Sequence, residues 1–341
     1  MPKKLEFGCL PTAIGSMPHM DALKACRLVL KYLPALPVWP QLSRRSPEES
    51  MYVQFSEGFP GIVVEGVNIY IDTSQELAPT LEKLYNNYLE NDFTDYTISP
   101  EYASGLHAFL SMKIGSPLAV KGQIIGPVSW GLSVTDGMRY VIYDETLAEA
   151  MARHLRLKAS WQEEALSKVS SNTIIFVDEP YLTSLGSPFV SISSEQAVAL
   201  LEETLAGINR TKGLHCCGNA DWPMLLSLPI DILSFDAYNY TSALSVYPDE
   251  VKSFLQRGGN IAWGIIPNDE DALAKETVAS LNDRLEESMA PFTRNDLRFG
   301  QLIEQGLITP SCGLDSLSEE AAEQALVSLA QLSEKLRKRY I

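Results

Sequence analysis

A repeated alternation of strand-like and helix-like segments is the feature that most constrains the fold of this chain. Each unit has a short apolar run rich in β-branched residues, a polar or Gly/Pro-marked turn, and a segment of helical periodicity. Such alternation is typical of a parallel sheet covered by helices, and eight units predict a single (β/α)8 TIM barrel. The predicted strands are Pro11–Ser16, Leu36–Gln41, Ala119–Ile125, Thr173–Asp178, Gly213–Cys217, Asp231–Asp236, Asn260–Ile266 and Gly306–Cys312.

One region departs from the alternation, between the second and third predicted strands. Ile62–Glu65 and Val67–Ile71 flank a glycine and predict a β-hairpin. Two helix-like segments follow, Gln75–Leu89 and Pro100–Met112. We interpret residues 43–115 as an insertion over the barrel mouth, within one domain that spans residues 1–341.

Helical periodicity is clear in the later part of the chain. It predicts helices over Leu147–Val169, Ser194–Ile208 and Asp271–Ser288, and a last helix near the C-terminus. Ser316 and Glu319 have the spacing of a capping box and predict where this last helix begins.

Charge and composition exclude several classes of partner. The chain has 27 basic and 43 acidic residues, a net charge of −16, which disfavours nucleic acid and anionic membranes. Lys3 and Lys4 are followed by no apolar segment, and no run approaches the ~20 apolar residues of a membrane helix, so we expect a cytoplasmic protein. The five cysteines are odd in number and clustered, which predicts reduced thiols instead of disulfides.

Polar side chains gather at the ends of the predicted strands. In a barrel of parallel strands the carboxyl ends carry the chemistry. Each buried polar group costs free energy unless it is paired, so this concentration predicts a site there. The residues are Ser16, Gln41, Asp178, His215, Cys217, Asp236 and Cys312.

The sharpest local signal is the run Gly213-Leu-His-Cys-Cys-Gly218. Side chains alternate along a strand, so His215 and Cys217 point to the same side and Cys216 points away. Cys312, at the end of the eighth predicted strand, can supply a third ligand. One histidine and two cysteines suit a catalytic zinc, which uses three protein ligands and leaves one position open. The alternative is a pair of core cysteines beside a hydrogen-bonded histidine.

Two aspartates are the candidate catalytic carboxylates. Asp236 is a candidate fourth, displaceable zinc ligand or a partner that orients His215, and a helix cap is an equal alternative. Asp178 follows a strongly apolar strand and suits a substrate ammonium group. The alternative is that Asp178 and Glu179 are a pair of loop carboxylates held in salt bridges.

Two further segments are candidates for substrate binding. In Thr12–Ser16, Gly15 allows close approach of the backbone, and the Ser16 hydroxyl with nearby N–H groups can hold a carboxylate, although an ordinary turn explains the segment equally well. Trp130, after Gly126 and Pro127, can form an apolar wall, and a core position is the alternative.

Taken together, these motifs resemble the C-terminal catalytic barrel of cobalamin-independent methionine synthase. They occur in the family's order and span nearly the whole chain. The wider superfamily includes uroporphyrinogen decarboxylase and the methylcobalamin:coenzyme M methyltransferases. The segments that carry the resemblance are Thr12-Ala-Ile-Gly-Ser16, Gly126-Pro127-Val128, Asp178-Glu179-Pro180, His215-x-Cys217 and Pro310-Ser-Cys-Gly-Leu314.

The resemblance implies a zinc centre that activates the thiol of homocysteine. His215, Cys217 and Cys312 match the family's zinc ligands. Asp236 takes the place of a glutamate ligand, and this shortening puts the fourth contact in doubt.

The resemblance also implies residues that hold the amino-acid end of the substrate. Ile14, Gly15 and Ser16 match the segment that binds the homocysteine carboxylate, and Asp178 matches the carboxylate that binds its amino group. Gln41 falls where the family has a second acidic contact to that group, so this contact is expected to be weaker.

Two departures concern the methyl donor. Full-length members of the family carry two barrels and use a folate, whereas this chain has the length of one. The family also has a histidine after the seventh strand, and Trp263–Asn268 contains none. Trp130 lies near the family's folate-facing tryptophan, but little else of that surface is present. This pattern implies a single-barrel "core" methionine synthase, with methylcobalamin on a corrinoid protein as donor.

Three functions compete at this point. The first is methylation of homocysteine, and the second is methylation of another thiol such as coenzyme M, which has no amino group for Asp178. The third is a uroporphyrinogen-decarboxylase-like lyase, or a non-catalytic relative that binds small molecules. A decarboxylase needs no zinc and favours arginines, of which Arg44 and Arg45 are the candidates.

Overall fold

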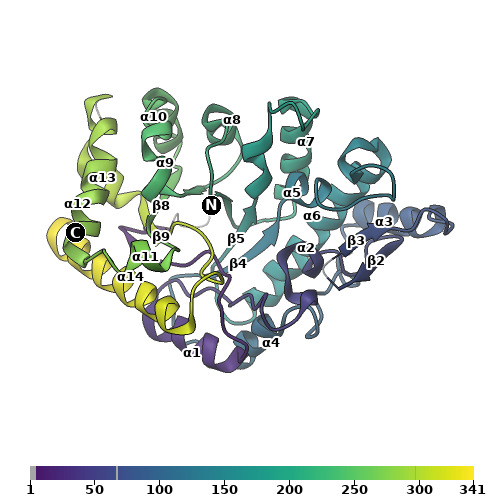
Figure 1. The fold of residues 1–341 in the computed structure, drawn as a ribbon, viewed down its shortest axis with the longest axis horizontal. Helices are drawn as coiled ribbons and strands as arrows, with labels where there is room; N and C mark the ends of the chain where they lie inside the picture. Colours follow the sequence, from purple (N-terminus) through teal and green to yellow (C-terminus); the bar gives the residue numbers. More distant parts are fainter. Residues whose placement is uncertain (1–4, 67, 296) are drawn as a thin grey trace.

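The computed structural model describes residues 5–66, 68–295 and 297–341. Its main element is a curled parallel sheet with helices on its outer side (Figure 1). Among the described residues this sheet has seven strands, in the order β1-β9-β8-β7-β6-β5-β4. The α/β prediction is confirmed, with one strand fewer than expected. The strands are β1 (Leu10–Pro11), β4 (Val120–Ile125), β5 (Thr173–Asp178), β6 (Thr211–Cys216), β7 (Ile232–Phe235), β8 (Asn260–Ile266) and β9 (Gly306–Pro310).

The predicted second strand, Leu36–Gln41, is wrong as a strand of this sheet. It contains two prolines, which lack the N–H group that a strand donates to its neighbour. The segment instead makes isolated parallel bridges, from Val38 to Lys121 on β4 and from Gln41 to Ser16 beyond β1. One extended segment thus contacts both edges of the curled sheet, β4 on one side and the residues after β1 on the other. This arrangement is consistent with a TIM-like barrel.

The first and last predicted strands differ from those observed: β1 (Leu10–Pro11) shares only Pro11 with the predicted Pro11–Ser16, and β9 ends at Pro310, two residues before the predicted Cys312. The polar residues that follow β1 and β9 therefore lie in loops at the carboxyl end of the sheet. Below them, a separate apolar cluster takes residues from most of the strands and from the proline-containing segment. Its buried members are Phe7, Leu36, Ala119, Ile174, Phe176, Ile232, Ala262 and Leu307.

Helices pack against the sheet through a second, larger apolar cluster. Across the described part of the chain, none has both the length and the apolar character needed to cross a bilayer. The α-helices are α1 (Ala22–Tyr32), α2 (Met51–Gln54), α3 (Ala78–Glu90), α4 (Ser104–Ser111), α5 (Pro127–Gly131), α6 (Glu145–Ser167), α7 (Ser194–Leu205), α8 (Trp222–Ser227), α9 (Ala237–Leu244), α10 (Pro248–Gln256), α11 (Glu270–Leu273), α12 (Val278–Met289), α13 (Phe299–Glu304) and α14 (Glu319–Tyr340).

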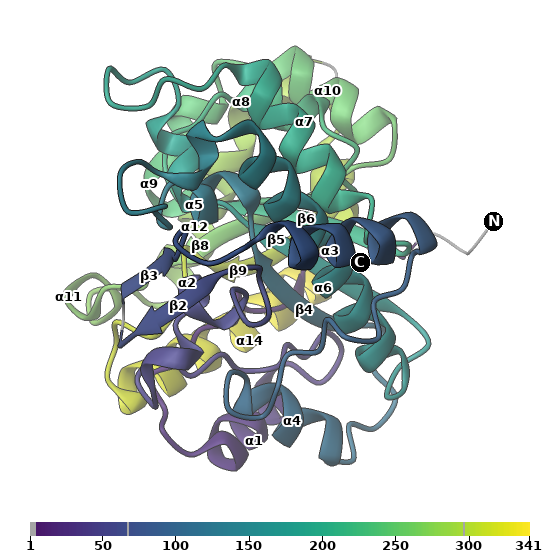
Figure 2. The same ribbon diagram turned by 90° about the vertical axis from the view of Figure 1, so that its right-hand side faces the viewer.

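The predicted hairpin is confirmed as an antiparallel pair, β2 (Ile62–Glu65) and β3 (Asn68–Ile71), although Val67 lies outside the described residues. The predicted helices after it correspond to α3 and α4. Tyr70 of the hairpin forms a bridge with Thr135, in the loop that follows α5. In Figure 2 the hairpin lies on the same side of the molecule as α9 and α11. These two helices are the ones that directly follow β7 and β8 in the chain. The hairpin therefore lies at the carboxyl end of the sheet.

The predicted helix Asp271–Ser288 is wrong in its continuity, because the structure breaks it into α11 and α12. Thr277 caps α12: its Oγ1 accepts a hydrogen bond from Ser280 N, and its own N–H donates to Ser280 Oγ. This reciprocal capping box is a start signal inside an otherwise continuous apolar pattern.

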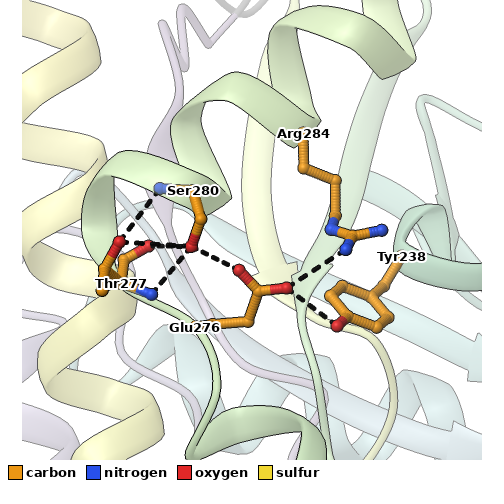
Figure 3. Close-up of polar contacts among 5 residues, drawn as sticks. All are labelled: Tyr238, Glu276, Thr277, Ser280 and Arg284. Atoms are coloured by element: carbon orange, nitrogen blue, oxygen red, sulfur yellow. Dashed lines mark hydrogen bonds and ion pairs between the residues drawn. The ribbon is translucent and has the colours of Figure 1, made fainter.

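Glu276 fixes the break against α9 (Figure 3). Its carboxylate accepts hydrogen bonds from the hydroxyl of Tyr238 at 2.8 Å and from the guanidinium of Arg284 at 3.2 Å. The same guanidinium lies 4.2 Å from the centre of the Tyr238 ring. These contacts tie α12 to α9, the helix that Asp236 caps.

The last helix begins two residues later than the predicted capping box implies. Ser318, not Ser316, caps α14 by accepting a hydrogen bond from Ala321 N. The hydroxyl of Ser316 instead donates to the carbonyl of Asn268, in the loop after β8.

Candidate metal centre

Three side chains from two distant parts of the sequence meet at the carboxyl end of the sheet. His215 lies on β6, Cys217 is the first residue after that strand, and Cys312 lies two residues after β9. One ligand atom from each residue lies within 4.8 Å of the other two, and the described residues form no other such group. Cys216 is fully buried in the apolar core. The structure therefore brings together the three predicted metal ligands and separates them from the neighbouring cysteine.

The ring of His215 has one engaged and one free nitrogen. Nδ1 lies 3.0 Å from the hydroxyl oxygen of Ser234 on the neighbouring strand β7. Nε2 is buried, and among the described residues it has no hydrogen-bond partner. A buried, unpaired ring nitrogen is costly unless it binds something, and a second partner on the other nitrogen is usual for histidines that bind metals.

Ser234→Ala is expected to weaken zinc binding by roughly 10- to 100-fold, because the His215 ring loses the contact that orients it. Competition with a chromophoric chelator measures this affinity. Ser160→Ala is the control. Ser160 lies on α6, away from the cluster, and its buried hydroxyl donates to Gly207 O. Equal zinc affinity in the Ser234 variant and the unchanged chain would show that Ser234 does not orient the ligand.

The two cysteines form a coupled pair. A hydrogen bond from the thiol of Cys312 and the neighbouring His215 lower the pKa of Cys217 to about 4. The same hydrogen bond, together with burial, raises the pKa of Cys312. Cys217 is therefore the first of the two sulfurs to become a thiolate. A free imidazole nitrogen, a thiolate and a second sulfur form a donor set that fits zinc.

The loop that carries Cys312 is held by Asn268, which follows β8. The Ser311 hydroxyl lies 2.9 Å from Asn268 Oδ1, and the Asn268 N–H donates to that hydroxyl. The Asn268 amide also donates to Gly313 O at 3.4 Å. Asn268 thus contacts the residues on both sides of Cys312.

Asp236 does not join the cluster, so the structure gives no support to it as a fourth ligand. Its Oδ1 accepts from Asn239 N at 2.9 Å and its Oδ2 accepts from Asn239 Nδ2 at 2.7 Å. These bonds cap α9, which is the alternative that the sequence left open. Burial and the negative charge of Cys217 raise the pKa of Asp236, so its carboxylate still lies within electrostatic reach of the cluster.

Asp178 and Glu179 have different surroundings. Asp178 ends β5 beside His215, and its buried Oδ1 has no hydrogen-bond partner in the part of the chain that the structure describes. Burial raises the pKa of Asp178 to about 6, although Lys121 and His215 oppose this change. Glu179 accepts hydrogen bonds from the N–H groups of Val128 and Ser129 and from the Ser129 hydroxyl. Glu179 therefore holds the start of α5, and Asp178 keeps an unpaired carboxylate oxygen.

The segment Ile14–Ser16 forms a turn after β1. Gly15 has a φ of +149°, and a Cβ atom there would lie 2.6 Å from the side-chain amide carbon of Gln123, so only glycine fits. The Ser16 hydroxyl lies 3.3 Å from Gln41 Oε1. Gln41 in turn donates to Gln54 Oε1 at 2.7 Å. The structure places Gln41 beside the turn, with its amide nitrogen already engaged.

Trp130 is a core residue, and the prediction that it lines the substrate site is not supported. Its side chain is 1% exposed and lies 5.0 Å from the Phe59 ring between centroids. Its Nε1 donates to Tyr52 O at 3.1 Å. Both the ring and its polar atom are therefore satisfied inside the protein.

Several residues near the cluster escaped the sequence analysis. Tyr52 and Tyr181 stack at 6.1 Å between ring centroids, and burial, Tyr181 and the negative charge of Cys217 raise the pKa of Tyr52. Lys121 lies inside the sheet near Asp178. Ser234 and Asn268 support metal-ligand candidates, as described above. Ser234 lies on β7 and Asp236 directly follows this strand, so their two-residue spacing was the one available signal.

Comparison with known proteins supports the fold. No protein-family model matches the chain, and a search of curated proteins found no match. The chain is similar to a solved structure described as a B12-independent methionine synthase from Shewanella sp. W3-18-1 in complex with selenomethionine. The TM-score is 0.60 and the identity 16%, over 97% of this chain and 98% of the other. At this identity the likeness concerns the fold alone: the chain has a methionine-synthase-like fold over nearly its whole length.

Proposed function

We propose that the chain is a zinc-dependent methyltransferase that moves a methyl group to the thiol of homocysteine and forms methionine. The observation that carries the proposal is the meeting of His215, Cys217 and Cys312, whose ligand atoms lie within 4.8 Å of one another. The unpaired carboxylate oxygen of Asp178 on the adjacent strand adds support. The resemblance to a methionine synthase fold points in the same direction.

The residues around the cluster have distinct roles in this proposal. A zinc ion held by the three ligands would keep a bound thiol deprotonated at neutral pH. Asp178 binds the amino group of homocysteine, while the N–H groups of Ile14–Ser16 and the Ser16 hydroxyl bind its carboxylate. Together they aim the sulfur at the cluster and fix its direction toward the methyl donor. Asp236 stays a nearby carboxylate that caps α9.

The competing functions explain fewer observations. Coenzyme M has no amino group, so Asp178 would keep a buried, unpaired oxygen. A decarboxylase of the uroporphyrinogen type favours arginines, but Arg45 donates to Glu49 at 2.6 Å within its own segment. Neither alternative uses the three ligand atoms and Asp178 together.

The identity of the methyl donor is proposed from the sequence. The sequence-based prediction is methylcobalamin on a corrinoid protein, whereas the solved neighbour is described as B12-independent. Zinc-loaded chain is to be incubated with homocysteine and either methylcobalamin or methyl-folate, and methionine measured. We expect methionine from methylcobalamin. Methionine from methyl-folate alone would overturn the donor prediction, and none from either donor would overturn the proposed function.

We also propose that the chain is one catalytic domain built on a closed (β/α)8 barrel, with residues 43–115 inserted at its mouth. The proline-containing segment bridges to Lys121 at one edge of the curled sheet and to Ser16 at the other, and these bridges support closure of the barrel. The position of the hairpin beside the α5 loop supports the place of the insertion.

A further inference from the structure

A charged side chain lies inside the curled sheet, beneath the candidate substrate site. Lys121, on β4, is 1% exposed, and its ammonium nitrogen donates to Ile14 O at 2.5 Å. The same nitrogen lies 4.3 Å from the centre of the Phe176 ring. Burial lowers the pKa of Lys121 to about 8, so the group remains mostly protonated at neutral pH.

Lys121 contacts the buried side of the turn that is proposed to bind the substrate carboxylate. Gln123 lies two residues further along the same strand, and its side-chain amide packs directly against Gly15 of that turn. β4 therefore supports Ile14 and Gly15 through two successive inward-facing side chains. Only Lys121 brings a charge to this contact.

The same ammonium group interacts with Asp178, which is proposed to bind the substrate amino group. Asp178 lies two residues beyond Phe176 on β5, at the level where His215 pairs with that strand. Lys121 and Asp178 thus place one positive and one negative charge in an interior that screens charges weakly. Burying an ammonium group is costly unless its charge is used or paired, so a lysine at this position calls for an explanation.

We infer that Lys121 is a positioning residue that makes the site select thiols carrying a carboxylate together with an amino group. Its positive charge favours a carboxylate on the Ile14–Ser16 turn, which it also holds in place through Ile14 O. Asp178 favours the amino group, so the pair matches the two charges of an amino acid. The inference rests on the proposed function, because it concerns the substrate of that same site.

The test compares three thiols on chain loaded with Co²⁺, where sulfur-to-cobalt absorption reports binding without turnover. The thiols are homocysteine, 4-mercaptobutanoate, which lacks the amino group, and 3-aminopropane-1-thiol, which lacks the carboxylate. Lys121→Met removes the charge and keeps the length of the side chain. Lys158→Met is the matched control, because Lys158 is also 1% exposed and also donates to a backbone carbonyl, that of Thr97.

Lys121→Met is expected to weaken binding of both carboxylate-bearing thiols by about tenfold or more, and to leave 3-aminopropane-1-thiol within about twofold. Lys158→Met should leave all three affinities unchanged. If Lys121→Met fails to fold, Lys121→Gln keeps a donor for Ile14 O without the charge and should give the same pattern. An equal loss for all three thiols would reduce Lys121 to a structural role and overturn the inference while leaving the proposed function intact. Absence of thiol binding in the unchanged, cobalt-loaded chain would overturn both.

Discussion

Cys217→Ser is expected to lose its bound zinc, falling from about one ion per chain to less than about a tenth, and to lose methyl transfer with it. The hydrogen bond from Cys312 and the neighbouring His215 lower the pKa of Cys217, which favours its thiolate form. A serine hydroxyl stays protonated at neutral pH and is a poor zinc ligand. Elemental analysis of dialysed protein measures the metal, and the methionine assay measures the activity.

Cys216→Ala is the matched control for this prediction. It removes the adjacent thiol, which is fully buried in the apolar core and apart from the three ligand atoms. We expect it to keep its zinc, and any loss to appear as lower thermal stability. Full zinc content in Cys217→Ser, or loss of zinc in Cys216→Ala, would contradict the assignment of the ligands.

Asp178→Asn is expected to raise the dissociation constant of homocysteine by roughly 10- to 100-fold, because a charge-assisted hydrogen bond to the amino group is lost. Zinc content should not change, since Asp178 is not one of the three ligands. Binding of 4-mercaptobutanoate, which has no amino group, should stay within about threefold of the unchanged chain. Titration of cobalt-loaded protein with both thiols measures the two affinities.

Glu179→Gln serves as the control for the aspartate, because it removes the neighbouring buried carboxylate. Glu179 accepts three hydrogen bonds at the start of α5, so its loss should lower stability without changing the preference between the two thiols. An Asp178→Asn variant that weakens both thiols equally would show that Asp178 does not bind the amino group.

The strands that the sequence predicted correctly are those whose apolar runs contain no proline. β4, β5 and β8 match their predicted ranges closely, and none of the three contains a proline. Leu36–Gln41 was the exception, since its apolar character predicts a strand while its two prolines prevent regular pairing. The apolar content of a segment predicts that it is buried. Whether it pairs as a regular β-strand depends on its backbone N–H groups, which proline lacks.

Alternation along a strand was enough to separate His215 and Cys217 from Cys216. The partner on the other side of His215 could not be predicted, because Ser234 faces it only through the register between β6 and β7. Lys121 was missed for a related reason: a lysine in an apolar run gives no sign of which carbonyl or carboxylate it will meet. Contacts between strands depend on register, which the sequence does not state.

Trp130 and Asp236 show the limit of motif reasoning. Both lie in segments that match the expected pattern, but Trp130 packs in the core and Asp236 caps a helix. The sequence identified these positions as alternatives, and the contacts with Tyr52 O and Asn239 N favour them. A short motif can identify a candidate residue, but the role of that residue depends on the atoms it contacts in the folded protein.

Zinc K-edge X-ray absorption on the purified chain tests the central claim most directly. The account predicts zinc with two sulfur neighbours at about 2.3 Å and at least one nitrogen neighbour at about 2.0–2.1 Å. Added homocysteine should raise the sulfur count by one. A zinc ion surrounded only by nitrogen and oxygen, or a chain that binds no zinc, would contradict the account.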